Sequence, residues 1–262
     1  MEKCDFLIIG AGIAGASAGY ELAAHGRVIV LEREDQPGYH STGRSAAVYS
    51  ESYGNRVVRA ITSAGRAFFE APPAGFAEGP LLSPRGFLFI ARTDQRDSLD
   101  TLLGDAEATA APVHPLDAAA ARALVPILDP GYVAAAAAEP AAMDMDVHAI
   151  HQGFLRGLRA RGGRIVARAE VRGLARIGED WRAETTAGVF AAPVVVNAAG
   201  AWADEIAGLA GVRPVGLVPK RRTAFVFDPP QDIPGLARWP VVVDVNEQFY
   251  FKPDAGRLLG SP

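Results

Sequence analysis

The sequence predicts an α/β fold that opens with a βαβ unit, and three observations within its first 32 residues support this. Residues 6–9 form a short, uninterrupted apolar run, and residues 28–31 repeat it, as expected for parallel strands covered on both faces. A glycine-rich turn over residues 10–15 follows the first run and leads into a helical stretch. The second run ends in the carboxylate of Glu32.

Each glycine of the turn has a separate expected role. Gly10 permits the sharp exit from the strand, Gly12 lets the backbone approach a pyrophosphate, and Gly15 lets helix and strand pack closely. The unpaired N–H groups and the positive dipole at the helix N-terminus favour an anion. Glu32 follows about 20 residues later, where a carboxylate accepts hydrogen bonds from ribose hydroxyls. The unit therefore predicts a dinucleotide site.

The rest of the chain also alternates between helical and strand patterns. Apolar residues at helical spacing predict helices over residues 56–69, 98–107, 117–124 and from Asp144-Met-Asp146 to Gly162-Gly163, where the carboxylates suit an N-terminus. Apolar runs predict strands over residues 87–90, 164–171, 181–186, 189–191, 194–200 and 224–227. The alanine run over residues 134–138 is interpreted as packing filler. The strand that ends in Ala198-Ala-Gly200 leaves room for a cofactor at the carboxyl edge of the sheet.

Composition excludes several classes of protein. A net charge of −4 without a basic run argues against a nucleic-acid partner, and no apolar stretch reaches the length of a membrane span. The N-terminus enters a strand at once, without the pattern of a secretory signal. A single cysteine, Cys4, excludes a disulfide framework and cysteine-rich metal sites. We therefore expect a cytoplasmic protein without a metal.

Four blocks spread along the chain resemble the D-amino-acid oxidase superfamily of FAD-dependent oxidoreductases, and within it the bacterial D-arginine dehydrogenases. They are His40-Ser-Thr-Gly-Arg-Ser-Ala-Ala47, Pro80-Leu-Leu-Ser-Pro-Arg85, Val218-Pro-Lys-Arg-Arg222 and Phe249-Tyr-Phe-Lys-Pro-Asp-Ala-Gly256. The resemblance implies a Rossmann-like FAD-binding domain of the glutathione-reductase type, over residues 1–80 and 144–214. It implies an inserted α+β substrate domain built on an antiparallel sheet, over residues 81–143 and 215–262.

Members of this superfamily continue beyond the equivalent of residue 262 with segments that complete the flavin domain. We therefore expect the C-terminal part to be missing, either because the chain is a fragment or because it is naturally truncated. We also do not expect the 262-residue chain alone to be active.

The resemblance also implies which residues bind FAD, without a covalent bond. They are Gly10, Gly12, Ile13, Ala14, Gly15, Glu32, Arg33, Ser41, Thr42, Gly43, Arg44, Ser45, Ala46, Val171, Ala199, Gly200 and Trp202. His40 directly precedes this loop and is interpreted as positioning it.

The implied reaction is the oxidative deamination of a D-amino acid. Hydride leaves the α-carbon for flavin N5, and the imine hydrolyses to a 2-oxo acid and ammonia. Arg222 matches the residue that holds the substrate carboxylate, for which a guanidinium fork is suited. Tyr53 and Tyr250 match pocket tyrosines. The alternative interpretations are a solvated charge for Arg222 and ordinary core packing for each tyrosine.

Two positions depart from the pattern of enzymes that act on basic amino acids. Phe87 stands where those relatives place a carboxylate, and Val48 stands where they place a histidine. A substrate guanidinium beside Phe87 would lack its counter-ion, at a cost on the order of 3–5 kcal/mol. We therefore expect an apolar or aromatic substrate side chain.

Two further functions remain open at this point. One is a glycine, sarcosine or 2-hydroxy-acid oxidoreductase of the same superfamily. The other is a truncated, non-catalytic product that binds nucleotide. The expected partners are a small amino acid and an electron acceptor, which is dioxygen for an oxidase or another carrier for a dehydrogenase.

Overall fold

The computed structural model describes residues 1–107, 113–229, 233 and 235–262, and its contacts divide the chain into two compact units. Unit 1 consists of Met1–Ala46, Pro72–Leu81 and Asp146–Lys220. Unit 2 consists of Ala47–Ala71, Leu82–Met145 and Arg221–Pro262. The predicted domain boundaries differ mainly for residues 47–71, which were assigned to the FAD-binding domain and have their contacts in unit 2.

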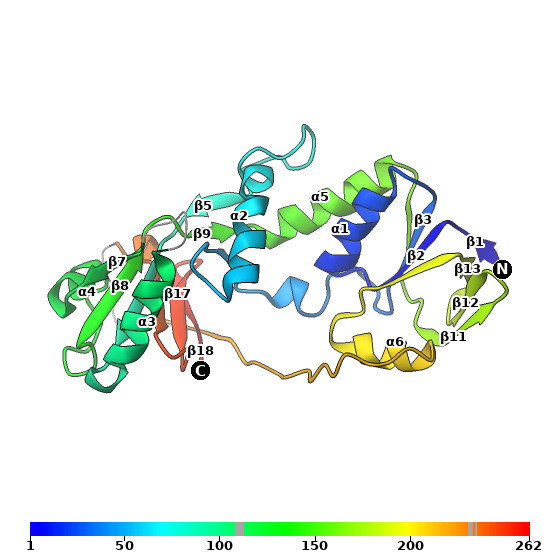
Figure 1. The fold of residues 1–262 in the computed structure, drawn as a ribbon. Coiled ribbons are helices and arrows are strands. Elements are labelled where there is room, and N and C mark those ends of the chain that lie inside the picture. The colour runs from blue at the N-terminus through cyan, green and yellow to red at the C-terminus, as the bar shows by residue number, and fades with distance from the viewer. Residues whose placement is uncertain (108–112, 230–232, 234) are drawn as a thin grey trace. The chain divides into compact units, whose positions relative to one another are not determined.

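A four-stranded parallel sheet forms the centre of unit 1 (Figure 1). Its strand order is β10 (Arg164–Val166), β3 (Val28–Leu31), β2 (Phe6–Ile9) and β14 (Val194–Asn197). Helix α1 (Ile13–Leu22) connects β2 to β3. The predicted βαβ unit is therefore confirmed, and both apolar runs are its central strands.

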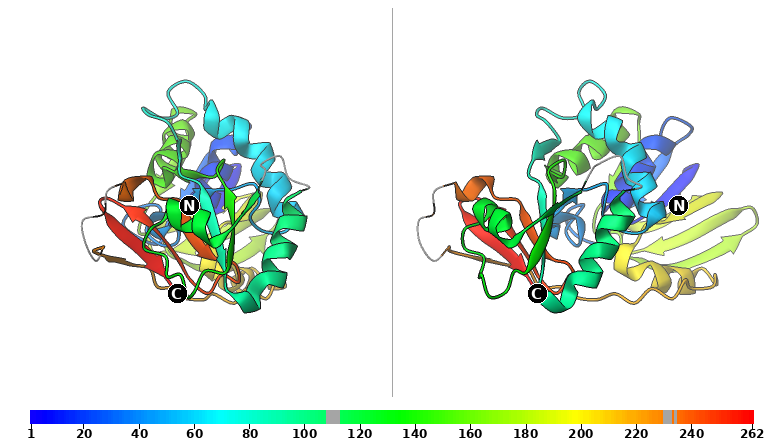
Figure 2. Two further views of the ribbon diagram at one scale, coloured as in Figure 1. Left: turned by 90° about the vertical axis from the view of Figure 1, so that its left-hand side faces the viewer. Right: turned by 60° about the vertical axis from the view of Figure 1, so that its left-hand side comes forward.

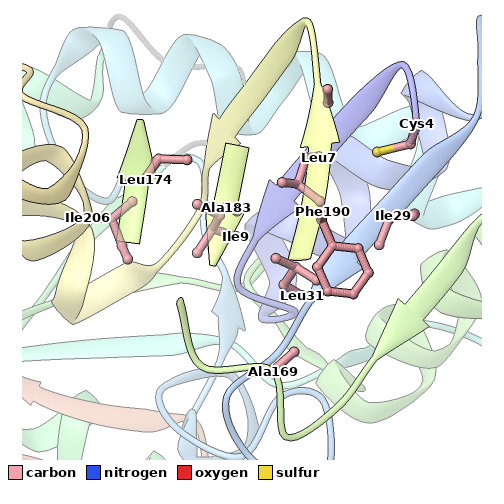
Figure 3. Close-up of a cluster of buried hydrophobic side chains, with 11 residues drawn as sticks. Cys4, Leu7, Ile9, Ile29, Leu31, Ala169, Leu174, Ala183, Phe190 and Ile206 are labelled. Carbon is pink, nitrogen blue, oxygen red and sulfur yellow. The ribbon is translucent and has the colours of Figure 1, made fainter. Parts of the chain in front are cut away.

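The two faces of this sheet are covered by different layers, because successive side chains of a strand point in opposite directions. Ile8 and Val30 pack against α1 and helix α5 (Val147–Ala160), where Leu158 is fully buried. Leu7 and Ile9 point to the opposite face, into the cluster drawn in Figure 3. Each central strand is apolar along its whole length for this reason.

An antiparallel sheet and helix α6 (Ala203–Leu209) supply the partners in that second cluster, among them Leu174, Phe190 and Ile206. The sheet has the order β1 (Glu2–Lys3), β13 (Gly188–Ala192), β12 (Asp180–Thr185) and β11 (Val171–Ile177). The short β1 pairs parallel to β13, and the other pairs are antiparallel. The small antiparallel meander predicted from residues 181–191 is therefore present.

Unit 2 is built on a seven-stranded sheet, in which the red C-terminal strands of Figure 2 belong to the same sheet as the green strand β8. Its order is β15 (Phe225–Phe227), β18 (Arg257–Ser261), β17 (Tyr250–Asp254), β16 (Val241–Asp244), β6 (Phe87–Ala91), β8 (Ala135–Glu139) and β7 (His114–Leu116). All pairs are antiparallel except β6 with β16. The sheet was expected to be antiparallel, and it is so except for the parallel pair of β6 and β16.

Two helices contribute to the cores on either side of this sheet. Leu88 and Val242 lie in a cluster with Ala121 of α4 (Ala118–Leu124), whereas Phe89 packs with Leu99 of α3 (Arg96–Ala106). Unit 2 also contains a small sheet of β4 (Val48–Tyr49), β9 (Met143–Met145) and β5 (Leu82–Pro84), and helix α2 (Arg56–Glu70).

Three local predictions need correction. The strand expected over residues 164–171 is two strands, β10 and β11, separated where Arg168 adopts a positive φ of 54°. Only Asp146 caps α5, by accepting from the backbone N of Ala149 at 2.8 Å, whereas Asp144 lies in β9. Strand β14 is an edge strand of its sheet, and Val194 is 44% exposed. The alanine run forms the buried strand β8, and its side chains fill the core of unit 2, as interpreted from the sequence.

Among the residues that the structure describes, no helix is long and apolar enough to cross a bilayer. The same residues contain no group of three or more His, Cys, Asp and Glu side chains arranged to hold a metal ion.

Candidate cofactor site

The glycine turn of unit 1 is shaped by contacts that exclude side chains. Gly10 has a φ of +102°, and a Cβ there would collide with the carbonyl oxygen of Ala198. A Cβ on Gly15 would collide with the carbonyl oxygen of Gly10. At Gly12 a Cβ would meet only the Thr42 hydroxyl, at 3.2 Å. Gly10 and Gly15 are therefore required for packing, whereas Gly12 keeps space free beside the helix N-terminus.

Helix α1 begins at this turn, with Gly12 as its N-cap and no side chain of its own as a cap. The backbone N of Ile13 donates to Thr42 Oγ1 at 2.9 Å, so one free N–H group is satisfied by the loop that follows β3. The other first-turn N–H groups have no acceptor within the helix. They and the helix dipole fit the pyrophosphate of a dinucleotide.

Glu32, at the end of β3, links this turn to the rest of the site. It is 7% exposed, and its two carboxylate oxygens accept from the backbone N of Ala11 and of Glu34, each at 3.0 Å. Each oxygen keeps a second lone pair, and the side chain lines the cavity described next. Glu32 therefore braces the glycine turn and retains the capacity to accept from a ribose hydroxyl.

A cavity of about 170 Å³ lies beside the turn in unit 1. Pockets for whole drug-sized ligands measure roughly 300–1,000 Å³, so this one fits a part of a dinucleotide. Ten of the predicted FAD-binding residues line it, from five separate segments. They are Gly10, Gly12, Glu32, Arg33, Ser41, Thr42, Val171, Ala199, Gly200 and Trp202.

The remaining predicted FAD-binding residues lie close by in sequence but are not part of the cavity wall. Ile13, Ala14 and Gly15 form the first turn of α1, and Gly15 is buried in packing. The backbone N of Gly43 donates to the Gly38 carbonyl at 2.7 Å, and the Arg44 guanidinium lies 4.9 Å from the ring centre of Tyr39. Ser45 and Ala46 follow the short helix η1 (Thr42–Arg44).

Trp202, which follows β14, contacts two residues of the loop after β3. The Arg33 guanidinium carbon lies 4.6 Å from its ring centre, and the His40 imidazole lies at the same 4.6 Å. His40 Nε2 is also 2.8 Å from Glu34 Oε1. The loop after β3 and the small-residue end of β14 are thereby held together, which is the positioning role expected of His40.

His151, on the amphipathic helix α5, also contacts the glycine turn. It is 3% exposed, and its Nε2 is 2.9 Å from the carbonyl oxygen of Ala11. Burial lowers its pKa, so the neutral ring that donates to this carbonyl is favoured. A Cβ on Gly38 would meet the same ring. His151 thus supports the glycine turn from behind, and no sequence pattern distinguishes it from a core histidine.

In unit 2, the structure brings Arg222 and Tyr250 together. The Arg222 guanidinium carbon lies 5.3 Å from the Tyr250 ring centre, and its Nε donates to Ser261 Oγ at 3.1 Å. Arg222 is exposed, so its terminal nitrogens are accessible to a carboxylate, for which a guanidinium fork is suited.

Tyr53 is close enough to Arg222 and Glu247 for both charges to act on its phenol, and it is 53% exposed. Partial burial, followed by the nearby Glu247 carboxylate, raises the pKa of the Tyr53 phenol, and the Arg222 guanidinium acts in the opposite direction. Glu247 follows the turn from β16 and has a positive φ of 56°. Glu247 could not be recognised from the sequence, because its polar neighbours Asn246 and Gln248 are typical of any exposed turn.

Phe87 and Val48, the expected specificity residues, are half-buried. The Phe87 ring stacks on Phe89 with 5.4 Å between ring centres, and Val48 lies opposite Asp144 in the β4–β9 pair. Part of the Phe87 ring is therefore used in the core of unit 2.

Asp144 binds one basic residue from each of two sequence blocks, 80–85 and 249–256. Its oxygens bind Arg85 Nε at 2.6 Å and Lys252 Nζ at 2.7 Å. Arg85 also donates to the carbonyl oxygens of Ala237 and Trp239. Arg85 and Lys252, from blocks far apart in the sequence, thus join the small sheet to the seven-stranded sheet within unit 2.

Comparison with known proteins shows the family of the chain. The family model of FAD-dependent oxidoreductases matches residues 5–261. Human mitochondrial dimethylglycine dehydrogenase is 24% identical over 266 residues, which cover 100% of this chain and 30% of that protein. The chain thus spans about a third of the length of that curated relative.

Solved structures show the same fold. L-α-glycerophosphate oxidase from Mycoplasma pneumoniae, with FAD bound, has a TM-score of 0.84 at 18% identity and covers 100% of this chain and 72% of its own. Iminodiacetate oxidase from Chelativorans sp. BNC1 has a TM-score of 0.77 at 27% identity. The match covers 98% of this chain and 70% of that protein. The more specific resemblance to D-arginine dehydrogenases is not shown by these comparisons and stays a prediction.

Proposed function

The chain belongs to the family of FAD-dependent oxidoreductases, and from that premise we propose that the protein oxidises the carbon–nitrogen bond of a small 2-amino acid. The observation that carries the proposal is the exposed cation of unit 2. Arg222 contacts Tyr250 and Ser261, and its terminal nitrogens are accessible to a carboxylate. Every 2-amino acid presents this carboxylate on the carbon that carries the carbon–nitrogen bond that would be oxidised.

FAD, when bound, supplies the hydride acceptor that this oxidation needs. The glycine turn, the N-terminus of α1, Glu32 and Trp202 would hold it in unit 1. Arg222 would bind the substrate carboxylate, and the Tyr53 and Tyr250 hydroxyls would donate to it or to the amine. With its carboxylate held, the substrate has a fixed α-carbon, and such positioning is a large part of catalysis.

The narrower proposal is a D-amino acid with an apolar or aromatic side chain. Phe87 and Val48 offer apolar surface, on which each substrate methylene gains about 0.8 kcal/mol. An unpaired substrate cation buried there would cost several kcal/mol. We propose further a cytoplasmic location and either dioxygen or another carrier as the electron acceptor.

A second candidate is an N-substituted glycine. Two of the similar proteins are named for dimethylglycine and iminodiacetate, both of which are glycines with substituents on nitrogen. Such a substrate presents the same carboxylate to Arg222 and differs only in where the added carbons lie. A 2-hydroxy acid would also present that carboxylate, so the amine must be tested separately.

A substrate panel under steady-state conditions separates these candidates. With the full-length protein and an artificial electron acceptor, kcat/KM is measured for apolar D-amino acids, D-arginine, sarcosine, dimethylglycine and a 2-hydroxy acid. We expect the apolar D-amino acids to give the highest value. A maximum for sarcosine or dimethylglycine would favour the second candidate, and activity with the 2-hydroxy acid alone would overturn amine oxidation.

Replacement of Arg222 by lysine tests the carboxylate site itself. Lysine keeps the charge but loses the planar fork, so we expect KM to rise about tenfold to a hundredfold. The matched control is Arg221→Lys, since Arg221 is the neighbour in the same basic triplet and is exposed, as Arg222 is. Equal kinetics for the two variants would remove Arg222 from the substrate site.

A further inference from the structure

Glu139, the last residue of β8, has no solvent exposure and accepts three hydrogen bonds from one short segment. Ser50 Oγ donates to Glu139 Oε2 at 2.7 Å, and Ser52 Oγ donates to the same oxygen. The backbone N of Glu51, between the two serines, donates to Oε1 at 3.1 Å. The three donor residues are at most 5% exposed, so the segment Ser50–Ser52 is fixed on one buried carboxylate.

The position of Glu139 in the sheet connects this segment to the proposed pocket wall. Glu139 lies directly opposite Phe87 in the antiparallel pair of β8 with β6. Residues that are opposite in such a pair have neighbouring side chains on the same face. The segment is therefore tied to the sheet next to Phe87. It is flanked by Val48 and Tyr49 on one side and by Tyr53 on the other.

A second carboxylate fixes the same segment to helix α2. The Tyr49 hydroxyl donates to Glu51 Oε1 at 2.6 Å, and Arg66 Nη1 lies 3.4 Å from Glu51 Oε2. Glu51 is 2% exposed. Glu139 therefore holds the segment on its sheet side through neutral donors, while Glu51 holds it on its helix side.

We propose that Glu139 is a positioning residue for the substrate site, which holds Ser50–Ser52 so that Tyr53 and Val48 keep their places relative to Phe87. The inference rests on the proposed function, since Tyr53, Val48 and Phe87 are its substrate-side residues. Glu139 itself does not touch substrate in this account. Its effect on the reaction passes through Tyr53.

Glu139→Gln is the informative variant, because it conserves size. Its amide group can accept at only one of the two oxygen positions, so it cannot satisfy both the serines and the backbone N of Glu51 in their present arrangement. The matched control is Asp228→Asn in the same unit, where an exposed carboxylate pairs with Arg257.

Hydrogen exchange measured on the FAD-loaded protein tests the anchoring without relying on activity. In Glu139→Gln we expect peptides covering residues 49–55 to exchange about tenfold faster or more, since bonds to a carboxylate are lost. Peptides from β12 in unit 1 should be unchanged, as should all peptides in Asp228→Asn. Unchanged exchange over residues 49–55 would overturn the inference.

A double-mutant cycle with Tyr53→Phe tests whether the effect passes through Tyr53. In the wild-type background we expect Glu139→Gln to lower kcat/KM at least tenfold, chiefly through KM. In the Tyr53→Phe background the same change should lower it less than threefold. Equal factors in both backgrounds would mean that Glu139 is merely structural, and would overturn the inference.

The outcomes separate this inference from the proposed function. If no amine reduces the flavin of the wild-type protein, the proposed function fails, whatever exchange shows. If amines are oxidised but Tyr53→Phe has wild-type kcat/KM, the proposed function stands and the positioning role of Glu139 is overturned. Two results together support both the proposed function and the positioning role of Glu139. These are faster exchange over residues 49–55 in Glu139→Gln and non-additive effects of Glu139→Gln and Tyr53→Phe on kcat/KM.

Discussion

The Glu32 carboxylate has two expected roles, which are binding FAD and stabilising the glycine turn. One substitution, Glu32→Ala, is expected to affect both. Its carboxylate binds the backbone N of Ala11 and of Glu34 while it lines the cavity. We expect Glu32→Ala to weaken FAD binding at least tenfold, since a bond to a charged group contributes roughly 1.5–3 kcal/mol. We also expect a loss of about 1–3 kcal/mol in the free energy of unfolding without FAD, because two backbone donors lose their acceptor.

An FAD titration and a urea unfolding curve measure the two effects separately. Glu32→Gln is the conservative control, because its amide oxygen can still serve one of the two backbone donors. We expect it to lie between wild type and Glu32→Ala in both measurements. An unchanged FAD affinity in Glu32→Ala would remove Glu32 from the ribose site.

His151 makes the stability of unit 1 depend on pH. Because burial lowers its pKa in the folded state, the unfolded chain binds a proton more readily than the folded one. Stability from this group is therefore complete above the unfolded pKa of about 6.5 and is lost as pH falls below it. We expect the free energy of unfolding to be lower at pH 5.5 than at pH 7.5 on this account.

The variant His151→Gln isolates this contribution from other titrating groups. Its amide can still donate to the carbonyl of Ala11 but does not titrate. Urea unfolding at the two pH values should give a smaller pH difference for the variant than for wild type. The same pH difference in both proteins would show that His151 does not contribute.

At the scale of elements, Gly12 distinguishes a cofactor cradle from ordinary close packing. Its backbone φ of −72° is accessible to alanine, and a Cβ would meet only the Thr42 hydroxyl. We therefore expect Gly12→Ala to change the free energy of unfolding by less than about 1 kcal/mol. FAD binding should nevertheless weaken at least tenfold, because the methyl group occupies the space beside the N-terminus of α1.

Gly19→Ala is the matched control within the same helix. A Cβ there would have its nearest contact at 3.3 Å, with a side-chain methyl of Val30 on the packed face of α1. We expect it to alter stability more than FAD affinity. If the two variants weaken FAD binding equally, the effect comes from helix packing and not from a cradle at Gly12.

Asp144 is the element-scale link within unit 2, since it joins Arg85 and Lys252 and all three side chains are less than 20% exposed. Removing one partner of a buried ion pair leaves uncompensated charge. We expect Asp144→Ala to lower the free energy of unfolding by about 3 kcal/mol. Asp228→Asn, which breaks the exposed pair with Arg257, should have little effect. Similar values for both variants would contradict a structural role for Asp144.

The elements that the sequence predicted well are those with strong local signals. The glycine turn, the strands at residues 6–9 and 28–31, and α2 follow from patterns within one helix or strand. The strand break at Arg168 did not follow, because arginine gives no signal for a positive φ. Asp144 was misassigned to a helix cap since its partners Arg85 and Lys252 lie far away in sequence.

The same limit applies to the sites. Glycine and carboxylate positions around FAD were predicted because their spacing in the sequence is short, and ten of the predicted residues line one cavity. Three other residues were not predicted, because each acts through contacts with a distant segment. They are His151, Glu139 and Glu247. An alanine-rich strand with a terminal glutamate gives no sign that its carboxylate will bind two serines about 90 residues earlier.

At the scale of the whole molecule, the two units divide the proposed work. Unit 1 contains the cavity and the glycine turn, and unit 2 contains Arg222, Tyr250, Tyr53 and the apolar Phe87. The family match extends over both units, from residue 5 to residue 261. The flavin and the amino acid are therefore expected to depend on different parts of the chain.

The most direct test of the central claim is the visible absorbance of the FAD-loaded protein after anaerobic addition of an apolar D-amino acid. We predict that the oxidised flavin bands disappear without added electron acceptor, as the α-carbon hydride is transferred. They should disappear more slowly when that carbon carries deuterium, and far more slowly in Arg222→Lys at the same amino-acid concentration. Flavin bands that persist with every amino acid, but disappear with a 2-hydroxy acid, would contradict amine oxidation by this protein.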